Sequence, residues 1–114
     1  MRIRRHKFRA KSSRCYQGHY HPSKLEAGYC DTLELLRKAG DIFHYENQPR
    51  IRLEVNGNKI CDHIPDFKVY RTRKDYESGH YEIHETKGYE SPVWNIKRKL
   101  FEALFPEIEY IVIK

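Results

Sequence analysis

Three side chains in the second half of the sequence have the types and spacing that metal-assisted phosphate chemistry requires. Asp66 follows Pro65, and nineteen residues later Glu85 and Lys87 flank Thr86. Residues two apart in a strand point to the same face, about 7 Å from each other, so Glu85 and Lys87 share one side. If Asp66 lies on the neighbouring antiparallel strand, its carboxylate meets that of Glu85 across the pair. The spacing therefore predicts two acids and a lysine around one point.

Carboxylates gathered in this way suit Mg²⁺, which keeps several waters and binds one or two carboxylates together with a substrate phosphate. A lysine beside the metal stabilises the attacking hydroxide or the charge that builds on phosphorus. The chemistry predicted from these residues is hydrolysis of a phosphodiester bond. Mg²⁺ is the expected cofactor, and Mn²⁺ is expected to substitute for it.

Two amphipathic helices are predicted to carry or support these groups. Ser23 followed by Glu26 has the spacing of a capping box, and apolar residues then recur every three to four positions up to Gly40, which indicates a helix over 24–39. Ser91 and Pro92 supply an N-cap and a first-position proline for a second helix that ends at Pro106.

The period changes to two between the helices, which predicts strands. Residues 51–55 alternate, Asn56-Gly57 is a strong hairpin turn signal, and a returning strand continues past Pro65 to Tyr70. Residues 71–80 are expected to form a loop, 81–87 a third strand, and 108–113 a last strand that is buried on both faces. The order α-β-β-β-α-β predicts an α/β fold with a small mixed central β-sheet flanked by helices.

These motifs resemble a known family. Pro65-Asp66 and Glu85-Thr86-Lys87 are similar to the signature of the PD-(D/E)XK, or restriction-endonuclease-like, nucleases, and Glu26 stands where that family often has a first-helix acid. Gln48-Pro49 and Lys97-Arg98-Lys99 extend the similarity to small phage-encoded nucleases, and the Glu-Thr-Lys-Gly strand resembles phage endonucleases that resolve branched DNA. The resemblance covers about residues 19–113 and implies a restriction-endonuclease-like core.

The resemblance also implies a role for each residue. Asp66, Glu85 and the backbone carbonyl of Thr86 would hold the metal, and Glu26 would complete a second or water-mediated contact. Lys87 would orient and activate the water, with Gln48 and Lys97 as supporting groups near the scissile phosphate. The implied protein is a Mg²⁺-dependent endodeoxyribonuclease, with branched or junction DNA as one substrate class. Cutting both strands of such a substrate would call for two active sites and so for a homodimer.

Charge points to the same partner. The 114 residues contain 22 Lys and Arg against 16 Asp and Glu, a net charge of +6, and the first fourteen residues contain many of the bases and no acid. A basic arm over residues 1–22 ahead of a single domain over 23–114 is typical of local contact with a polyanion, and DNA is the expected partner. The residues expected to bind DNA are Arg2, Arg4, Arg5, Lys7, Arg9, Lys11, Arg14 and Arg98.

Other interpretations remain open for each residue. Glu26 serves equally well as the capping partner of Ser23, Asp66 as a turn residue, and Glu85 with Lys87 as an ion pair on a solvated strand. A noncatalytic nucleic-acid-binding module built on the same fold is the alternative function. Such a module has no use for an inward cluster of acids, because these repel phosphate unless a cation lies between.

Cysteines and histidines suggest zinc, but their spacing argues against it. No Cys-x-x-Cys pair occurs and the ligands would come from three separate elements, so burial without a metal is the prediction for Cys15, His19, His21, Cys30, Cys61 and His63. Three widely spaced cysteines do not form a disulfide framework. No apolar run is long enough to span a membrane, so a soluble, cytoplasmic protein is expected, in the host cell if phage-encoded.

Overall fold

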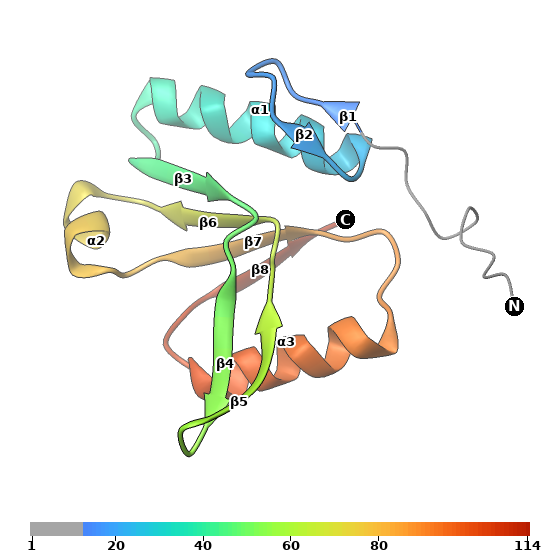
Figure 1. The fold of residues 1–114 in the computed structure, drawn as a ribbon. Coiled ribbons are helices and arrows are strands. Elements are labelled where there is room, and N and C mark those ends of the chain that lie inside the picture. Colours follow the sequence, from blue (N-terminus) through green and yellow to red (C-terminus); the bar gives the residue numbers. More distant parts are fainter. Residues whose placement is uncertain (1–12) are drawn as a thin grey trace, which may run out of the picture.

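The computed structural model describes residues 13–114, so the predicted DNA contacts from Arg2 to Lys11 lie outside the described residues. The described chain is a mixed α/β fold with three helices and three small sheets (Figure 1). Its elements are β1 (Ser13–Arg14), β2 (Tyr20–His21), α1 (Lys24–Ala39), β3 (His44–Asn47), β4 (Ile51–Val55), β5 (Asn58–His63), β6 (Phe67–Tyr70), α2 (Arg73–Ser78), β7 (Glu82–Thr86), α3 (Pro92–Leu104) and β8 (Tyr110–Ile113).

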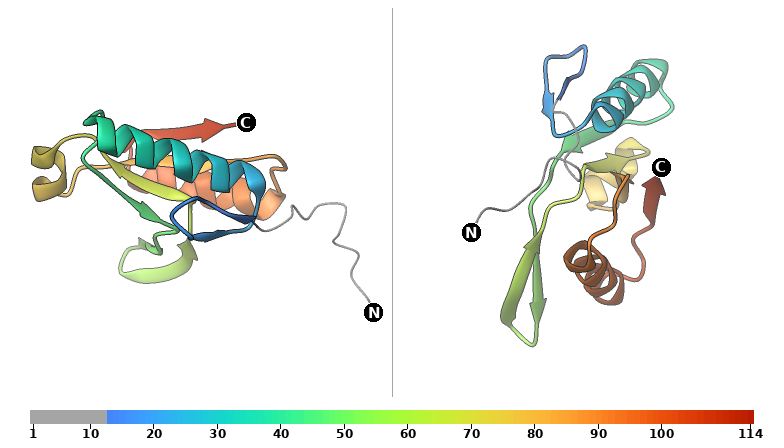
Figure 2. Two further views of the ribbon diagram at one scale, coloured as in Figure 1. Left: turned by 90° about the horizontal axis from the view of Figure 1, so that it is seen from above. Right: turned by 90° about the vertical axis from the view of Figure 1, so that its right-hand side faces the viewer.

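The predicted small mixed sheet is confirmed. Its strand order is β3-β6-β7-β8, in which β6 is antiparallel to both of its neighbours, β3 and β7, and β8 runs parallel to β7. Helix α1 lies on one side of this sheet and α3 on the other (Figures 1 and 2). The hairpin β4–β5 extends away from the sheet beside α3. Helix α3 is the crossover that a parallel pair of strands requires between β7 and β8.

Each face of the sheet has its own apolar core. On the α1 side Cys30 and Leu33 pack with Phe67 and Val69, all fully buried. On the α3 side the centre is Phe101, which packs with Leu53 of the hairpin and Ile83 of β7. Successive residues of a strand point to opposite faces, so Ile83 and Glu85 face α3 while His84 faces α1.

Both predicted helices are confirmed, together with their caps. The hydroxyl of Ser23 accepts a hydrogen bond from the Glu26 amide at 3.1 Å, and Gly40 ends α1 in the left-handed conformation with φ of 85°. Ser91 accepts from the Trp94 amide at 3.1 Å at the start of α3. Capping groups within one turn of the helix set these boundaries, which is why the sequence locates them well.

Residues 13–22 differ from the predicted unpacked arm. They form the hairpin β1–β2, in which Cys15 and His21 are buried against α1. The predicted loop over 71–80 contains the short helix α2, with the hydroxyl of Thr72 accepting from the Asp75 amide. The segment has almost no apolar residue, so no period indicates a helix after this cap.

The strands also differ in extent and burial. The returning strand is two elements, β5 and β6, separated around Pro65, because proline cannot donate to a ladder. Strand β3 was not predicted at all. Strand β8 is only half-buried along its length, against the expectation of burial on both faces, because it is an edge strand with β7 as its neighbour.

Candidate functional site

Asp66 lies at the end of the sheet, immediately before β6. The antiparallel register pairs Phe67 with His84, so the next pair in sequence would be Asp66 and Glu85. Asp66 Oδ2 accepts hydrogen bonds from the Thr86 amide at 2.8 Å and from the Thr86 hydroxyl at 2.7 Å. These two bonds fix the carboxylate of Asp66 against the end of β7. Asp66 therefore bridges two strands and is not simply a turn residue.

Glu85 is 2% exposed and points to the α3 side of the sheet. Its Oε1 accepts a hydrogen bond from the hydroxyl of Tyr110 at 2.6 Å, and this hydroxyl lies 2.7 Å from Nε2 of His63. Burial and, next, the negative charge of Asp66 raise the pKa of Glu85 to about 7. Glu85 is buried and lies near a second acid. It is therefore not half of an ion pair with Lys87 on a solvated strand.

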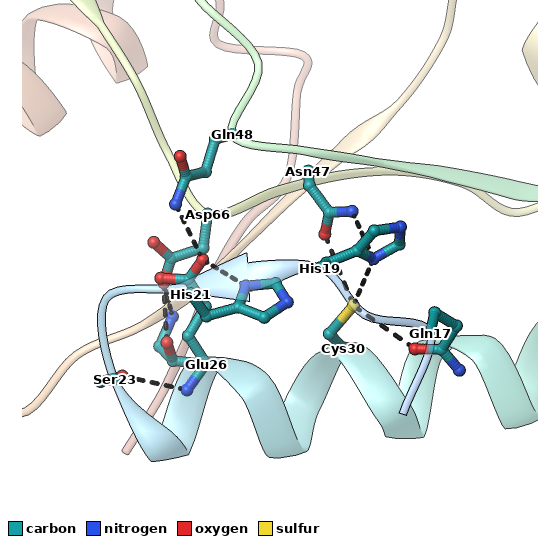
Figure 3. A network of polar contacts seen from close by, with 10 residues as sticks. Gln17, His19, His21, Ser23, Glu26, Cys30, Asn47, Gln48 and Asp66 are labelled. Carbon is teal, nitrogen blue, oxygen red and sulfur yellow. Dashed lines mark hydrogen bonds and ion pairs between the residues drawn. The ribbon is translucent and has the colours of Figure 1, made fainter. Parts of the chain in front are cut away.

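Glu26 reaches the same region from the first turn of α1. Its Oε2 lies 2.8 Å from Nδ1 of His21 and accepts from Nε2 of Gln48 at 3.1 Å (Figure 3). Burial and then the charge of Asp66 raise the pKa of Glu26 to about 8. The Glu26 amide takes part in the helix cap, while its side chain is directed toward Asp66. Glu26 can therefore serve both as the capping partner of Ser23 and as a member of the group of acids.

Lys87 follows β7 and is electrostatically close to both buried acids. Its positive charge lowers the pKa of Glu26 and that of Glu85, opposing the effects of burial and Asp66. The Lys87 Nζ atom lies 4.7 Å from the centre of the Trp94 ring on α3, a cation–π contact that positions the amine. The structure thus brings together Glu26, Gln48, Asp66, Glu85 and Lys87.

Three other predicted residues lie outside this group. Lys97 is near His63, because its charge, after burial, helps to lower the pKa of His63 to about 4. Arg98 lies over the rings of Trp94 and Tyr110, with its guanidinium carbon 5.6 and 5.2 Å from their centres. Arg14 lies over Tyr20 at the far hairpin. Lys97 and Arg98 thus both act on the hydrogen-bond chain to Glu85, Lys97 through His63 and Arg98 through Tyr110.

A second cluster was missed. The side chains of Cys15, His19, His21 and Cys30 offer ligand atoms that all lie within 4.8 Å of one another. Cys15, His21 and Cys30 are buried as predicted and His19 is exposed, but the sequence did not predict that these four side chains meet. Cys61 and His63 lie elsewhere, on β5. Within residues 13–114 no second set of three or more such side chains has these distances. Glu26, Asp66 and Glu85 are therefore arranged more loosely than ligands closed around an ion.

The spacing Cys-x₃-His-x-His was a usable signal for the second cluster. It places three possible ligands within one short hairpin, and Cys30 follows Glu26 by one helical turn. The absence of a Cys-x-x-Cys pair argued against this signal, and a hairpin of two-residue strands has almost no hydrophobic pattern by which its position beside α1 can be predicted.

Sequence comparison places the chain in a family. The profile of DUF1064, described as a protein of unknown function, matches residues 5–114, and the chain belongs to this family. Neither a curated protein nor a solved structure gave a significant match. No helix among the described residues is long and apolar enough to cross a membrane.

Proposed function

We propose that this protein is a metal-dependent endodeoxyribonuclease of the PD-(D/E)XK type, with a restriction-endonuclease-like core. One observation carries the proposal: acids from three separate elements approach one another beside a lysine. Glu26 comes from α1, Asp66 from the start of β6 and Glu85 from β7, and the charge of Asp66 acts on both of the others. The first helix, the mixed sheet and the helix that crosses over to the last strand support a core of this class.

The electrostatics of the acids favour a cation. Burial of Glu26 and Glu85 near Asp66 raises the pKa of both glutamates, which measures the free energy that opposes their ionisation. A divalent cation between them would reverse that balance, and oxygen ligands of this kind suit Mg²⁺ or Mn²⁺. The looser spacing of the three acids matches Mg²⁺, which retains waters and is bound through few direct carboxylates.

The chain's own residues have distinct roles in this proposal. Asp66 and Glu85, with the carbonyl of Thr86, would hold Mg²⁺, which supplies Lewis-acid stabilisation of charge on the scissile phosphate. Lys87 orients the attacking water and stabilises the negative charge that develops on it. Gln48 donates to Glu26 and keeps this carboxylate turned toward Asp66. Lys97 and the bases of residues 1–12 add phosphate affinity that does not depend on sequence.

Two substitutions test the proposal. Asp66→Asn keeps an oxygen that accepts from Thr86, and Lys87→Ala removes the amine that lies over Trp94. Each is expected to lower Mg²⁺-dependent cleavage of a plasmid or a four-way junction at least about a hundredfold, while DNA binding without Mg²⁺ is retained. Asp62→Asn is the matched control, because Asp62 pairs with Arg50 and Lys59 on the β4–β5 hairpin and should leave cleavage unchanged.

Circular dichroism and thermal melting of each variant separate loss of chemistry from loss of folding. Cleavage that is equal in wild type, Asp66→Asn and Lys87→Ala would remove the assignment of these residues. DNA binding with no cleavage by the wild type across a titration of Mg²⁺ and Mn²⁺ would instead establish the noncatalytic nucleic-acid-binding module.

A further inference from the structure

The second cluster has the distances of a tetrahedral metal site. Zinc bound to two sulfurs and two nitrogens separates its ligand atoms by about 3.3 to 3.8 Å, as follows from bond lengths near 2.3 and 2.0 Å. His19 Nδ1 lies 3.4 Å from the Cys30 sulfur, within this range, and all four ligand atoms lie within 4.8 Å of one another. The longest separation exceeds this range by no more than about 1 Å, which is the movement that binding of the ion requires.

His21 provides an independent observation. It is 1% exposed, its Nδ1 lies against Glu26, and its Nε2 is buried without any hydrogen-bond partner. A buried ring nitrogen without a partner is costly. Figure 3 shows this nitrogen turned away from Glu26 and toward the sulfur of Cys30. Metal-ligating histidines commonly donate their other N–H to a carboxylate, and Glu26 is in place to receive it.

The local fold also has a use for a cross-link. Strands β1 and β2 have two residues each, and a ribbon of this size is not stable alone. Its turn is closed by backbone bonds from the Cys15 amide to His19 and from the Gly18 amide to Cys15, which hold Cys15 and His19 side by side. Cys30 comes from α1, so a metal ion bound by residues of both elements would fix the hairpin to the helix.

We propose that Cys15, His19, His21 and Cys30 bind one zinc ion, with Glu26 holding the ring of His21 from outside the ligand set. Cys15 and Cys30 release their thiol protons to solvent on binding, and the two thiolates balance the charge of Zn²⁺. Because Zn²⁺ and its two thiolates are neutral together, the site avoids the cost of burying an unpaired charge. The four ligands leave no open position for water or substrate, so the site is structural. Zinc prefers this mixture of sulfur and nitrogen, whereas Mg²⁺ prefers oxygen.

Metal content tests the proposal without reference to nuclease activity. The full chain, expressed in zinc-containing medium and freed of loose metal, is expected to contain one zinc per molecule by plasma mass spectrometry. Cys15→Ser and His19→Gln should each lose most of it, while Cys61→Ser and His44→Gln, outside the cluster, should keep it. Asp66→Asn should also keep it, which distinguishes this site from the cluster of acids.

Cobalt reports the ligand set directly. Replacement of zinc by Co²⁺ is expected to give the intense visible absorption of a tetrahedral site with thiolate charge-transfer bands, and Cys15→Ser should weaken both. A chain that stays free of zinc after refolding with an excess of the ion overturns the proposal. So does a disulfide between Cys15 and Cys30, detected as a mass two daltons below that of the thiol form and assigned to this pair among the three cysteines by peptide mapping. Equal zinc in the wild type and in Cys15→Ser would place the metal elsewhere.

Discussion

The hydroxyl of Tyr110 is the most sharply testable group near the acids. It donates to Glu85 at 2.6 Å, and because it has a single proton it must accept from Nε2 of His63 at 2.7 Å. Tyr110→Phe removes both contacts and leaves the ring in place. Glu85 and His63 are each 2% exposed, so solvent compensates for neither loss.

The magnitude follows from the two bonds. A hydrogen bond to a charged group contributes about 1.5–3 kcal/mol and a neutral one about 1 kcal/mol, so Tyr110→Phe should lower the free energy of unfolding by about 2–4 kcal/mol. Urea unfolding at pH 8, where Glu85 is ionised because its pKa is about 7, measures this quantity without added Mg²⁺. Tyr76→Phe is the control, because Tyr76 is 46% exposed and the substitution keeps the ring that contacts Phe43 and Tyr70, so stability should change by less than about 0.5 kcal/mol.

A double-mutant cycle isolates the Tyr110–Glu85 contact. Pairing Tyr110→Phe with Glu85→Gln should give a coupling energy of about 1–3 kcal/mol, because residues in direct contact are not additive. A loss of stability no greater than that of Tyr76→Phe, or a coupling energy near zero, would refute the chain of bonds from His63 through Tyr110 to Glu85.

Two further predictions concern charge. Burial lowers the pKa of His63 to about 4, so between that value and an unfolded pKa near 6.5 the unfolded chain binds a proton that the folded chain excludes. Stability is therefore complete above pH 6.5 and falls as the pH drops toward 4, by about 3 kcal/mol at most, and His63→Gln should flatten this part of a urea-derived pH profile; an unchanged slope would contradict the assignment. Removal of residues 1–12, which contain six Lys and Arg, should reduce the slope of log K for DNA against log salt by up to about 5, because each lost phosphate contact contributes about 0.9. An unaltered slope in a fluorescence titration would show that these bases do not contact DNA.

Local signals made the helices predictable. Ser23, Gly40 and Ser91 act within one turn of the residues they cap, so the bounds of α1 and α3 follow from short stretches of sequence. The pairing of Asp66 with the end of β7 was also predictable, because the period of two and the antiparallel order fix which side chains meet. For Asp66, the alternation of side chains within each strand and the antiparallel order of the strands lead to the same pairing.

The parts that escaped prediction depend on partners distant in the sequence. Strand β3 has one buried residue, Tyr45, and exists because β6 pairs with it. The half-burial of β8 depends on its edge position, which no feature of its own four residues encodes. Cys15 and Cys30 meet only because a hairpin folds back over α1. Periodicity reports the environment of one element and does not report which neighbour covers it.

Helix α1 links the two clusters physically. Glu26 and Cys30 are one turn apart on the same helix face, so one contributes to the group of acids and the other to the cysteine–histidine cluster. His21 joins them, because its Nδ1 contacts Glu26 while its Nε2 points to the cluster. In the zinc proposal, loss of the ion would free the ring that orients Glu26 and so weaken the acids. Asp66→Asn removes none of the four proposed ligands, although the charge of Asp66 acts on His21, and it should leave the hairpin in place. An arrangement of this kind makes the first acid depend on the folding of residues 13–22, although the remaining acids come from the sheet.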